Sequence, residues 1–236
     1  MIDEALFRYV GSKESAVDSV VNRFRDLIMQ RKLKPGDQIP NESVLAEGMG
    51  VSRGSVREAM KILAALGVVE IRRGNGTYVS GEIGRSMLDP FLLRLMMNDY
   101  DSRQMAEFRE MIELDVARAI LRNKSAEGIM AMGEAIKRME GVPAEEGVEE
   151  ARWAELDLAF HRAMGKATGN VLIEQLYEFV LQFFEPTIRQ TYRHPGNRAH
   201  ALDIHKHIYN AAANGDEKAL LDAVTTSIEE WIIQGE

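Results

Sequence analysis

Residues 41–67, NESVLAEGMGVSRGSVREAMKILAALG, and residues 68–80, VVEIRRGNGTYVS, decide the fold of this chain. The first segment has the pattern of two helices separated by a tight, glycine-containing turn. The second has the pattern of two short strands that meet at a basic, glycine-rich tip. A helix-turn-helix followed by such a hairpin is a winged helix. We therefore expect its second helix to enter the major groove of DNA and the hairpin tip to reach the adjacent backbone or minor groove.

The flanking residues complete a three-helix head. Residues 15–31 carry apolar side chains at helical spacing, and Pro35-Gly36-Asp37 ends that pattern. Asn41 is a good N-cap for the second helix, the turn is expected at residues 48–50, and Ser52 or Ser55 begins the third helix. Gly67 stops the third helix. The wing is predicted to have two strands, joined where Gly74 and Gly76 supply positive φ angles.

After Phe91 the strand signal disappears and the pattern becomes entirely helical. Amphipathic helices are predicted over about 105–120, 129–139, 149–167, 170–185, 199–213 and 216–233. The predicted fold is therefore mainly α: an N-terminal winged helix-turn-helix, of three helices plus a two-stranded wing, followed by an all-α helical bundle. The predicted boundaries are 1–80 for the head, 81–89 for a linker and 90–236 for the bundle.

Composition places the chain among globular proteins and excludes some chemistry. Of its 236 residues, 45% are hydrophobic and 28% are charged. The absence of cysteine excludes disulfides, thiolate catalysis and cysteine-type zinc sites. The acidic start has no long apolar core, and the apolar patch at Phe91–Met97 is interrupted by Arg94 and too short to cross a bilayer. We expect a cytoplasmic protein without a membrane partner.

The charge is unevenly distributed along the chain. The formal net charge is −8, yet residues 1–80 carry 12 basic and 10 acidic side chains, against 17 and 27 in the remainder. A weakly basic head on an acidic body suits a head that faces phosphates and a body that does not.

The head carries arginines where a winged helix contacts DNA. Arg53 and Arg57 lie four residues apart on the third helix, opposite its apolar face, and arginine paired with guanine is the commonest specific base contact. Hydroxyls at the helix start and basic side chains at the wing tip suit phosphate contacts. Solvated surface arginines are the alternative. The further candidates for DNA contact are Ser52, Ser55, Arg72, Arg73 and Gly74.

Two polar pairs stand out in the helical body. Asp157 and His161 are one turn apart, so they share a helix face and suit either one divalent cation or a packed histidine hydrogen-bonded to its neighbour. His205 is expected on the inward side of its own helix. Arg109 and Glu113 are also one turn apart, which by itself indicates an ordinary salt bridge.

The head resembles the DNA-binding domain of the GntR family of bacterial transcription regulators. The resemblance runs through LKPGDQIPNESVLAEGMGVSRGSVREAMKILAALGVVEIRRGNGTYV and covers about residues 15–80. It implies base contacts by Arg53 and Arg57 and a minor-groove contact by Arg73 and Gly74. Ser43 is a further candidate for DNA contact; some members carry a DNA-contacting arginine at its position, so the resemblance implies that a base contact is missing there.

The body resembles the FCD effector domain of that family over about residues 90–233. The similar segments are FREMIELDVARAI, DLAFHRAMGKATGN and HKHIYNAAANGDEKAL. The resemblance implies a pocket that Arg109 faces, with Glu113 beside it, where a guanidinium would pair with an effector carboxylate. It also implies a divalent metal, zinc or similar, at Asp157, His161 and His205. Metal-binding members have a third histidine where Ser227 stands, so either a three-ligand site or loss of the metal is implied.

The leading hypothesis is a DNA-binding transcription regulator, expected to repress, that binds operator DNA as a homodimer. A small organic acid, such as a sugar acid or another carboxylate, would control that binding from the body. A metal-responsive regulator is the alternative. A metal-dependent enzyme with a DNA-binding head is a third reading, against which no HExxH, GxSxG or P-loop pattern occurs. We therefore expect no enzymatic activity and no catalytic residue.

Overall fold

The computed structural model describes residues 15–80, 94–95, 97–142, 150–194 and 196–235. The chain divides into two compact units, residues 1–95 and 96–236. The predicted linker at 81–89 lies outside the described residues. The predicted boundaries at residues 80 and 90 remain predictions.

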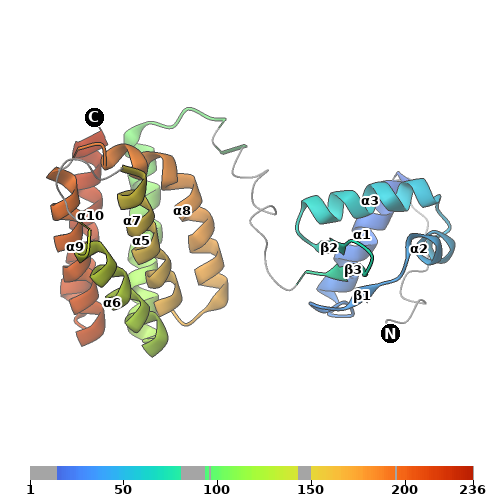
Figure 1. Cartoon of the computed structure of the whole chain (residues 1–236), viewed down its shortest axis with the longest axis horizontal. Coiled ribbons are helices and arrows are strands. Elements are labelled where there is room, and N and C mark those ends of the chain that lie inside the picture. The colour runs from blue at the N-terminus through green and yellow to red at the C-terminus, as the bar shows by residue number, and fades with distance from the viewer. Residues whose placement is uncertain (1–14, 81–93, 96, 143–149, 195, 236) are drawn as a thin grey trace. The chain divides into compact units, whose positions relative to one another are not determined.

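The first unit contains helices α1 (Ala16–Met29), α2 (Glu42–Met49) and α3 (Arg53–Ala65), seen in Figure 1. The residue before each helix is an N-cap: its side chain accepts a hydrogen bond from a backbone N–H of the first turn. These N–H groups have no acceptor within the helix itself. These caps are Ser15, Asn41 and Ser52. Of the two residues predicted to begin the third helix, Ser52 is therefore the cap.

The turn between α2 and α3 is shorter than predicted. Gly48 and Met49 belong to α2, and Met49 is buried in the core. Gly50 alone takes the left-handed conformation at the end of the helix, with φ of 66°, which glycine adopts without a steric penalty. The predicted turn at residues 48–50 was wrong for the first two positions, because the burial of Met49 extends the helix.

The wing contains one strand more than predicted. Strands β2 (Val69–Arg72) and β3 (Gly76–Val79) form the expected antiparallel hairpin, with Val69 opposite Val79. A two-residue strand, β1 (Gln38–Ile39), pairs with the other edge of β3, which gives the order β1-β3-β2. The predicted two-stranded wing is therefore a three-stranded sheet. Two residues are too short to carry an alternating pattern, so this pairing has no local sequence signal.

A single apolar core holds the head together. It joins the inward faces of all three helices to the ends of the hairpin strands. Burial of this surface fixes the angle at which α3 is presented, because densely packed side chains leave little room for sliding. Its large members include Phe24, Leu27, Leu45, Met49, Met60 and Leu63.

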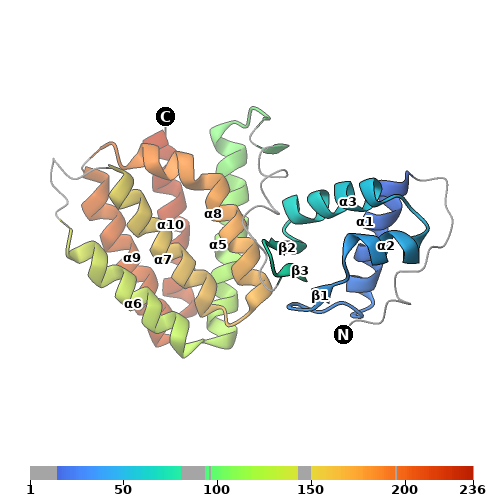
Figure 2. The same cartoon turned by 45° about the vertical axis from the view of Figure 1, so that its right-hand side comes forward.

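The described part of the second unit is a bundle of helices (Figure 2). The helices are α5 (Ser102–Asn123), α6 (Ala126–Glu140), α7 (Glu150–Ala167), α8 (Val171–Thr191), α9 (Gly196–Asn214) and α10 (Glu217–Gly235). Helix α7 contacts α5, α6 and α8, so residues on its inward face lie near the centre of the bundle. This confirms the predicted all-helical body.

Helix α8 continues beyond its predicted end near residue 185. Pro186 lies inside the helix, although proline lacks the N–H of a helical hydrogen bond. The turn that follows buries Ile188, and Tyr192 at the C-cap is also buried. Tertiary packing of these side chains offsets the loss of one backbone hydrogen bond. The extension brings Tyr192 to the polar cluster described below.

Helices α6 and α7 approach closely at Gly128, where an added Cβ would overlap the backbone of Ala167.

Within the described part of the chain, no helix has both the length and the apolar character needed to span a bilayer.

Candidate functional site

Helix α3 presents both of its predicted DNA-contacting arginines to solvent. Arg53 is the first residue of the helix and is exposed, and the Arg57 side chain is 61% exposed. The side chain of Ser52 accepts from the Ser55 backbone N–H at 3.0 Å, and the two hydroxyls lie 2.9 Å apart. The geometry thus brings an N-cap, two hydroxyls and two guanidinium groups to one end of a helix, where DNA-binding helices enter the groove.

Arg57 is held by a carboxylate from the neighbouring helix. Its Nε and Nη2 donate to Glu42 Oε2 at 3.0 and 2.7 Å. The hydrogen bond with Arg57 is the largest cause that lowers the pKa of Glu42. Because Glu42 is the first residue of α2, the ion pair joins the two helices of the helix-turn-helix and limits the rotamers of Arg57. Glu42 was not among the site residues predicted from the sequence.

The wing arginines have different surroundings. Arg72 donates to Glu70 Oε2 from Nη2 at 2.9 Å, and its guanidinium lies 4.5 Å from the centre of the Tyr78 ring. Arg72 is therefore fixed on the strand surface. Arg73 and Gly74 are exposed at the tip, and Gly74 has φ of 75°. The predicted DNA contacts of Arg72, Arg73 and Gly74 remain predictions.

Ser43 is exposed in the first turn of α2, and its backbone N–H donates to the Asn41 side chain at 3.0 Å. Its side chain is short, and the missing base contact at this position remains a prediction.

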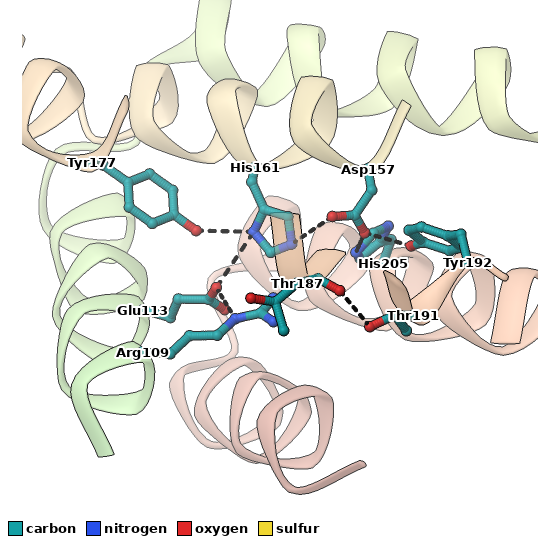
Figure 3. A network of polar contacts seen from close by, with 9 residues as sticks. All are labelled: Arg109, Glu113, Asp157, His161, Tyr177, Thr187, Thr191, Tyr192 and His205. Carbon is teal, nitrogen blue, oxygen red and sulfur yellow. Dashed lines mark hydrogen bonds and ion pairs between the residues drawn. The ribbon is translucent and has the colours of Figure 1, made fainter. Parts of the chain in front are cut away.

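The body holds a buried polar cluster at the predicted metal residues (Figure 3). Asp157 and His161 lie on α7 and His205 on α9. Their exposed fractions are 5%, 0% and 2%, and one ligand atom from each lies within 4.8 Å of the others. The structure thus brings together three residues that lie up to 48 positions apart in sequence.

The cluster holds its carboxylate charged and one histidine neutral. Burial would raise the pKa of Asp157, but His161, His205, a Tyr192 hydrogen bond and Arg109 lower it below its ordinary value. Burial lowers the pKa of His205 to about 4, against the pull of Asp157. At neutral pH His205 is therefore uncharged, as a metal-ligating imidazole must be.

The spacing of the cluster suits a metal ion. Ligands about 2.1 Å from zinc at tetrahedral angles lie about 3.4 Å apart. Asp157 Oδ1 lies 3.3 Å from His205 Nε2, and Asp157 Oδ2 lies 3.7 Å from His161 Nε2. His161 Nε2 is buried and has no hydrogen-bond partner among the described residues. A buried nitrogen in this state costs free energy unless a ligand satisfies it, so the donor set fits a divalent cation.

Two tyrosines that the sequence did not single out as site residues complete the cluster. The Tyr192 hydroxyl donates to Asp157 Oδ1 at 2.6 Å, and the Tyr177 hydroxyl lies 2.9 Å from His161 Nδ1. Tyr177 lies on α8 and Tyr192 is its C-cap, and both side chains are buried. The position of Tyr192 depends on the helical turn beyond Pro186, which the sequence analysis did not predict.

Arg109 and Glu113 form the i,i+4 salt bridge that the sequence alone indicated. Arg109 Nε donates to Glu113 Oε1 at 2.8 Å, with both side chains almost fully buried. Burial would raise the pKa of Glu113, but the charges of Arg109 and His161 lower it, so the carboxylate stays ionised. Among the described residues Arg109 also lines the cavity beside Asp157, whereas Glu113 lies outside that lining.

A cavity of about 50 Å³ opens beside the cluster. Ser227, on α10, is in its wall together with Asp157 and His205, and the cavity therefore brings the position of the missing histidine to the candidate metal residues. The volume suits a few water-sized groups, so a larger molecule requires the helices to move. Other polar wall residues are Thr191, Asn197 and His200.

Two family models match the chain. The model described as "Bacterial regulatory proteins, gntR family" matches residues 16–79, and the FCD domain model matches residues 104–230. The first match spans the three-helix head with its wing, and the second spans nearly all of the described bundle.

Similar proteins cover most of the chain. The HTH-type transcriptional regulator LutR of Bacillus subtilis (strain 168) is 31% identical over 213 residues, which is 86% of this chain and 95% of that protein. The galactonate operon transcriptional repressor of Escherichia coli (strain K12) is 25% identical over 89% of this chain and 93% of its own length. The structure of Streptococcus agalactiae GntR has a TM-score of 0.63, 25% identity and coverage of 92% and 99%.

Proposed function

This chain belongs to the GntR family of bacterial regulatory proteins and carries an FCD domain, and from that premise we propose that a small organic acid, bound in the helical body, controls its binding to operator DNA. The single observation that supports this most is the buried cluster of Asp157, His161 and His205, beside a cavity that Arg109 also lines. A guanidinium and a cation placed together favour a carboxylate.

For the DNA complex, we propose that a homodimer presents two copies of α3 to a near-palindromic operator. Arg53 and Arg57 read bases, Ser52 and Ser55 contact phosphate, and the wing tip reaches the adjacent minor groove. The exposure of Ser52, Arg53 and Arg57, and the carboxylate that orients Arg57, support the assignment. Light scattering tests the assembly: a dimer has twice the 26.5 kDa mass of one chain.

The arginine assignment is tested with DNA selected from a random-sequence pool by the wild-type chain. Arg57→Ala should weaken binding to the selected site by about 1–3 kcal/mol, since a bidentate contact to one base has about that value. Arg118→Ala is the matched control, because Arg118 is an exposed, ion-paired arginine on α5 of the body. Equal affinities of the two variants in fluorescence anisotropy would remove Arg57 from the base-reading set.

For the body, we propose that Asp157, His161 and His205 hold one divalent cation. The cation would supply positive charge for an effector carboxylate. The protein side chains position that carboxylate, with Arg109 as its bidentate partner. Elemental analysis of the full chain purified without chelator, and after dialysis against zinc, tests the metal; His161→Ala should lose it.

The effector class is tested by a thermal-shift screen of sugar acids and short hydroxy acids against the zinc-loaded chain. A ligand that binds only the native state raises the melting temperature in proportion to its affinity. The cavity of about 50 Å³ favours short acids, which need the smallest rearrangement of the helices. Repression is the expected mode, in which the effector releases the operator.

A metal-responsive regulator is the second candidate, and the gathering of ligand atoms from Asp157, His161 and His205 within 4.8 Å of one another favours it. In that case zinc alone changes operator affinity, and no acid adds to the effect. We take the cluster as regulatory and not catalytic, because the relatives that this chain matches over most of their length are named as transcription regulators or repressors.

A further inference from the structure

The two ring nitrogens of His161 meet different chemistry (Figure 3). Its Nε2 points to Asp157 Oδ2 across 3.7 Å and has no hydrogen-bond partner among the described residues. Its Nδ1 lies 2.9 Å from the Tyr177 hydroxyl and 3.7 Å from Glu113 Oε1. One side of the ring therefore faces the ligand cluster, while the other faces a phenol and a carboxylate from two further helices.

A neutral imidazole carries one N–H and one lone pair, and its surroundings decide which nitrogen has the proton. Burial raises the pKa of Tyr177 well above its ordinary value, and the charge of Glu113 and a hydrogen bond to it are further causes. Because an ionised carboxylate only accepts hydrogen bonds, the Tyr177 hydroxyl is the donor in its contact with Glu113. The phenol oxygen is then left to accept from His161 Nδ1. The opposite arrangement puts the proton on Nε2, where Asp157 Oδ2 at 3.7 Å is too distant for a hydrogen bond.

We propose that Tyr177 and Glu113 are positioning residues that hold His161 in its Nδ1–H tautomer, so that the Nε2 lone pair faces Asp157 and His205 as a metal ligand. Only the role of the Nε2 lone pair as a metal ligand rests on the metal site of the proposed function. The tautomer itself is a property of the metal-free chain. Arg109 is part of the arrangement, because it donates at 2.8 Å to the same Glu113 oxygen that lies nearest His161 Nδ1.

The arrangement has a measurable consequence for metal affinity. A ligand histidine in the wrong tautomer must first move its proton, and loss of the outer partner of a metal-bound histidine commonly weakens metal binding 10- to 100-fold. The partner also keeps the ring from rotating about its Cβ–Cγ bond. Tyr177 and Glu113 are both essentially buried, at 1% and 2% exposure, so water does not substitute readily for either.

The first experiment reads the tautomer without metal. Long-range ¹H–¹⁵N correlation spectra of the metal-free full chain with ¹⁵N-labelled histidine distinguish Nδ1–H from Nε2–H rings. The signals of His161 are those missing from His161→Asn. The expected result is Nδ1–H in the wild type and a shift toward Nε2–H in Tyr177→Phe. An Nε2–H ring in the wild type would overturn the proposal.

The second experiment measures zinc affinity by competition with a chromophoric chelator. Tyr177→Phe and Glu113→Gln should each weaken zinc binding 10- to 100-fold. Glu107→Gln is the matched control and should leave it unchanged, because Glu107 forms the same i,i+4 pair with Arg103 on the same helix but in solvent. If Glu113→Gln fails to fold, Tyr177→Phe, which removes one hydroxyl, decides the result.

Zinc affinity that is equal in Tyr177→Phe and the wild type would overturn the positioning role. A wild type that binds no zinc would instead contradict the metal part of the proposed function. The tautomer spectra of the metal-free chain would then decide this inference by themselves, so the two failures are distinguishable.

Discussion

Acidification should destabilise the helical body through one buried histidine. Burial lowers the pKa of His205 to about 4, whereas a histidine in an unfolded chain titrates near about 6.5. Below about pH 6.5 this histidine is protonated in the unfolded chain, whereas in the folded chain it stays neutral until the pH approaches 4. The stability due to neutral His205 is therefore complete above about pH 7 and is lost progressively as the pH falls toward 4.

The size of the loss follows from the two pKa values. A difference of about 2.5 units corresponds to about 3 kcal/mol if the titration is complete. Between pH 7 and 4.5 it corresponds to about 2 kcal/mol, since the folded chain has begun to take up the proton. The range ends at pH 4.5 because the carboxylates of the cluster, including Asp157, contribute at lower pH.

The assay is urea unfolding of the chelator-treated chain, followed by tryptophan fluorescence. Both tryptophans, Trp153 and Trp231, belong to residues 96–236, so the signal reports the body. The comparison is between the wild type and His205→Gln, which cannot titrate in this range. The wild type should lose about 2 kcal/mol more than the variant between pH 7 and 4.5. Equal losses would refute the argument that His205 is buried in its neutral form.

Other residues give sharp expectations. Ser227→His should tighten zinc binding at least about tenfold in chelator competition, since imidazole is a far better ligand than a hydroxyl; unchanged affinity would place residue 227 outside the ligand set. Gly128→Ala should lower the stability of the body by about 1–3 kcal/mol or more in urea unfolding, because the new methyl group would overlap the Ala167 backbone; a neutral result would contradict the close packing of α6 on α7. Glu42→Gln frees Arg57 from its ion pair and should reduce the ratio of operator to random-DNA affinity in anisotropy titrations; an unchanged ratio would show that Arg57 needs no orientation.

Local signals in the sequence predicted most of the head. The N-cap at Ser52, the stop at Gly67 and the hairpin glycines each depend on the chemistry of one or two residues, which can be recognised without knowing the fold. The strand Gln38–Ile39 could not be predicted, because its pairing with Thr77 and Tyr78 joins residues 38 and 40 positions apart. A pattern of two residues has no periodicity to detect.

The buried cluster was predictable only in part. Asp157 and His161 share a helix face by spacing alone, and the resemblance to FCD domains added His205. Tyr177 and Tyr192 escaped because their roles depend on where α8 crosses α7, and on a helix that continues through Pro186. Glu42 escaped for a similar reason, since its contact with Arg57 spans two helices.

The most direct test of the whole account is operator affinity with and without acid ligands in a protein whose buried cluster has been altered. Zinc-loaded wild type and His161→Gln are titrated against the selected operator at fixed salt, in buffer and in a mixture of sugar acids and short hydroxy acids. If the body controls the head, the acid mixture should change the wild-type Kd for the operator at least tenfold, which corresponds to about 1.4 kcal/mol of coupling. The Kd of His161→Gln should not change. Equal responses of the two proteins would contradict it.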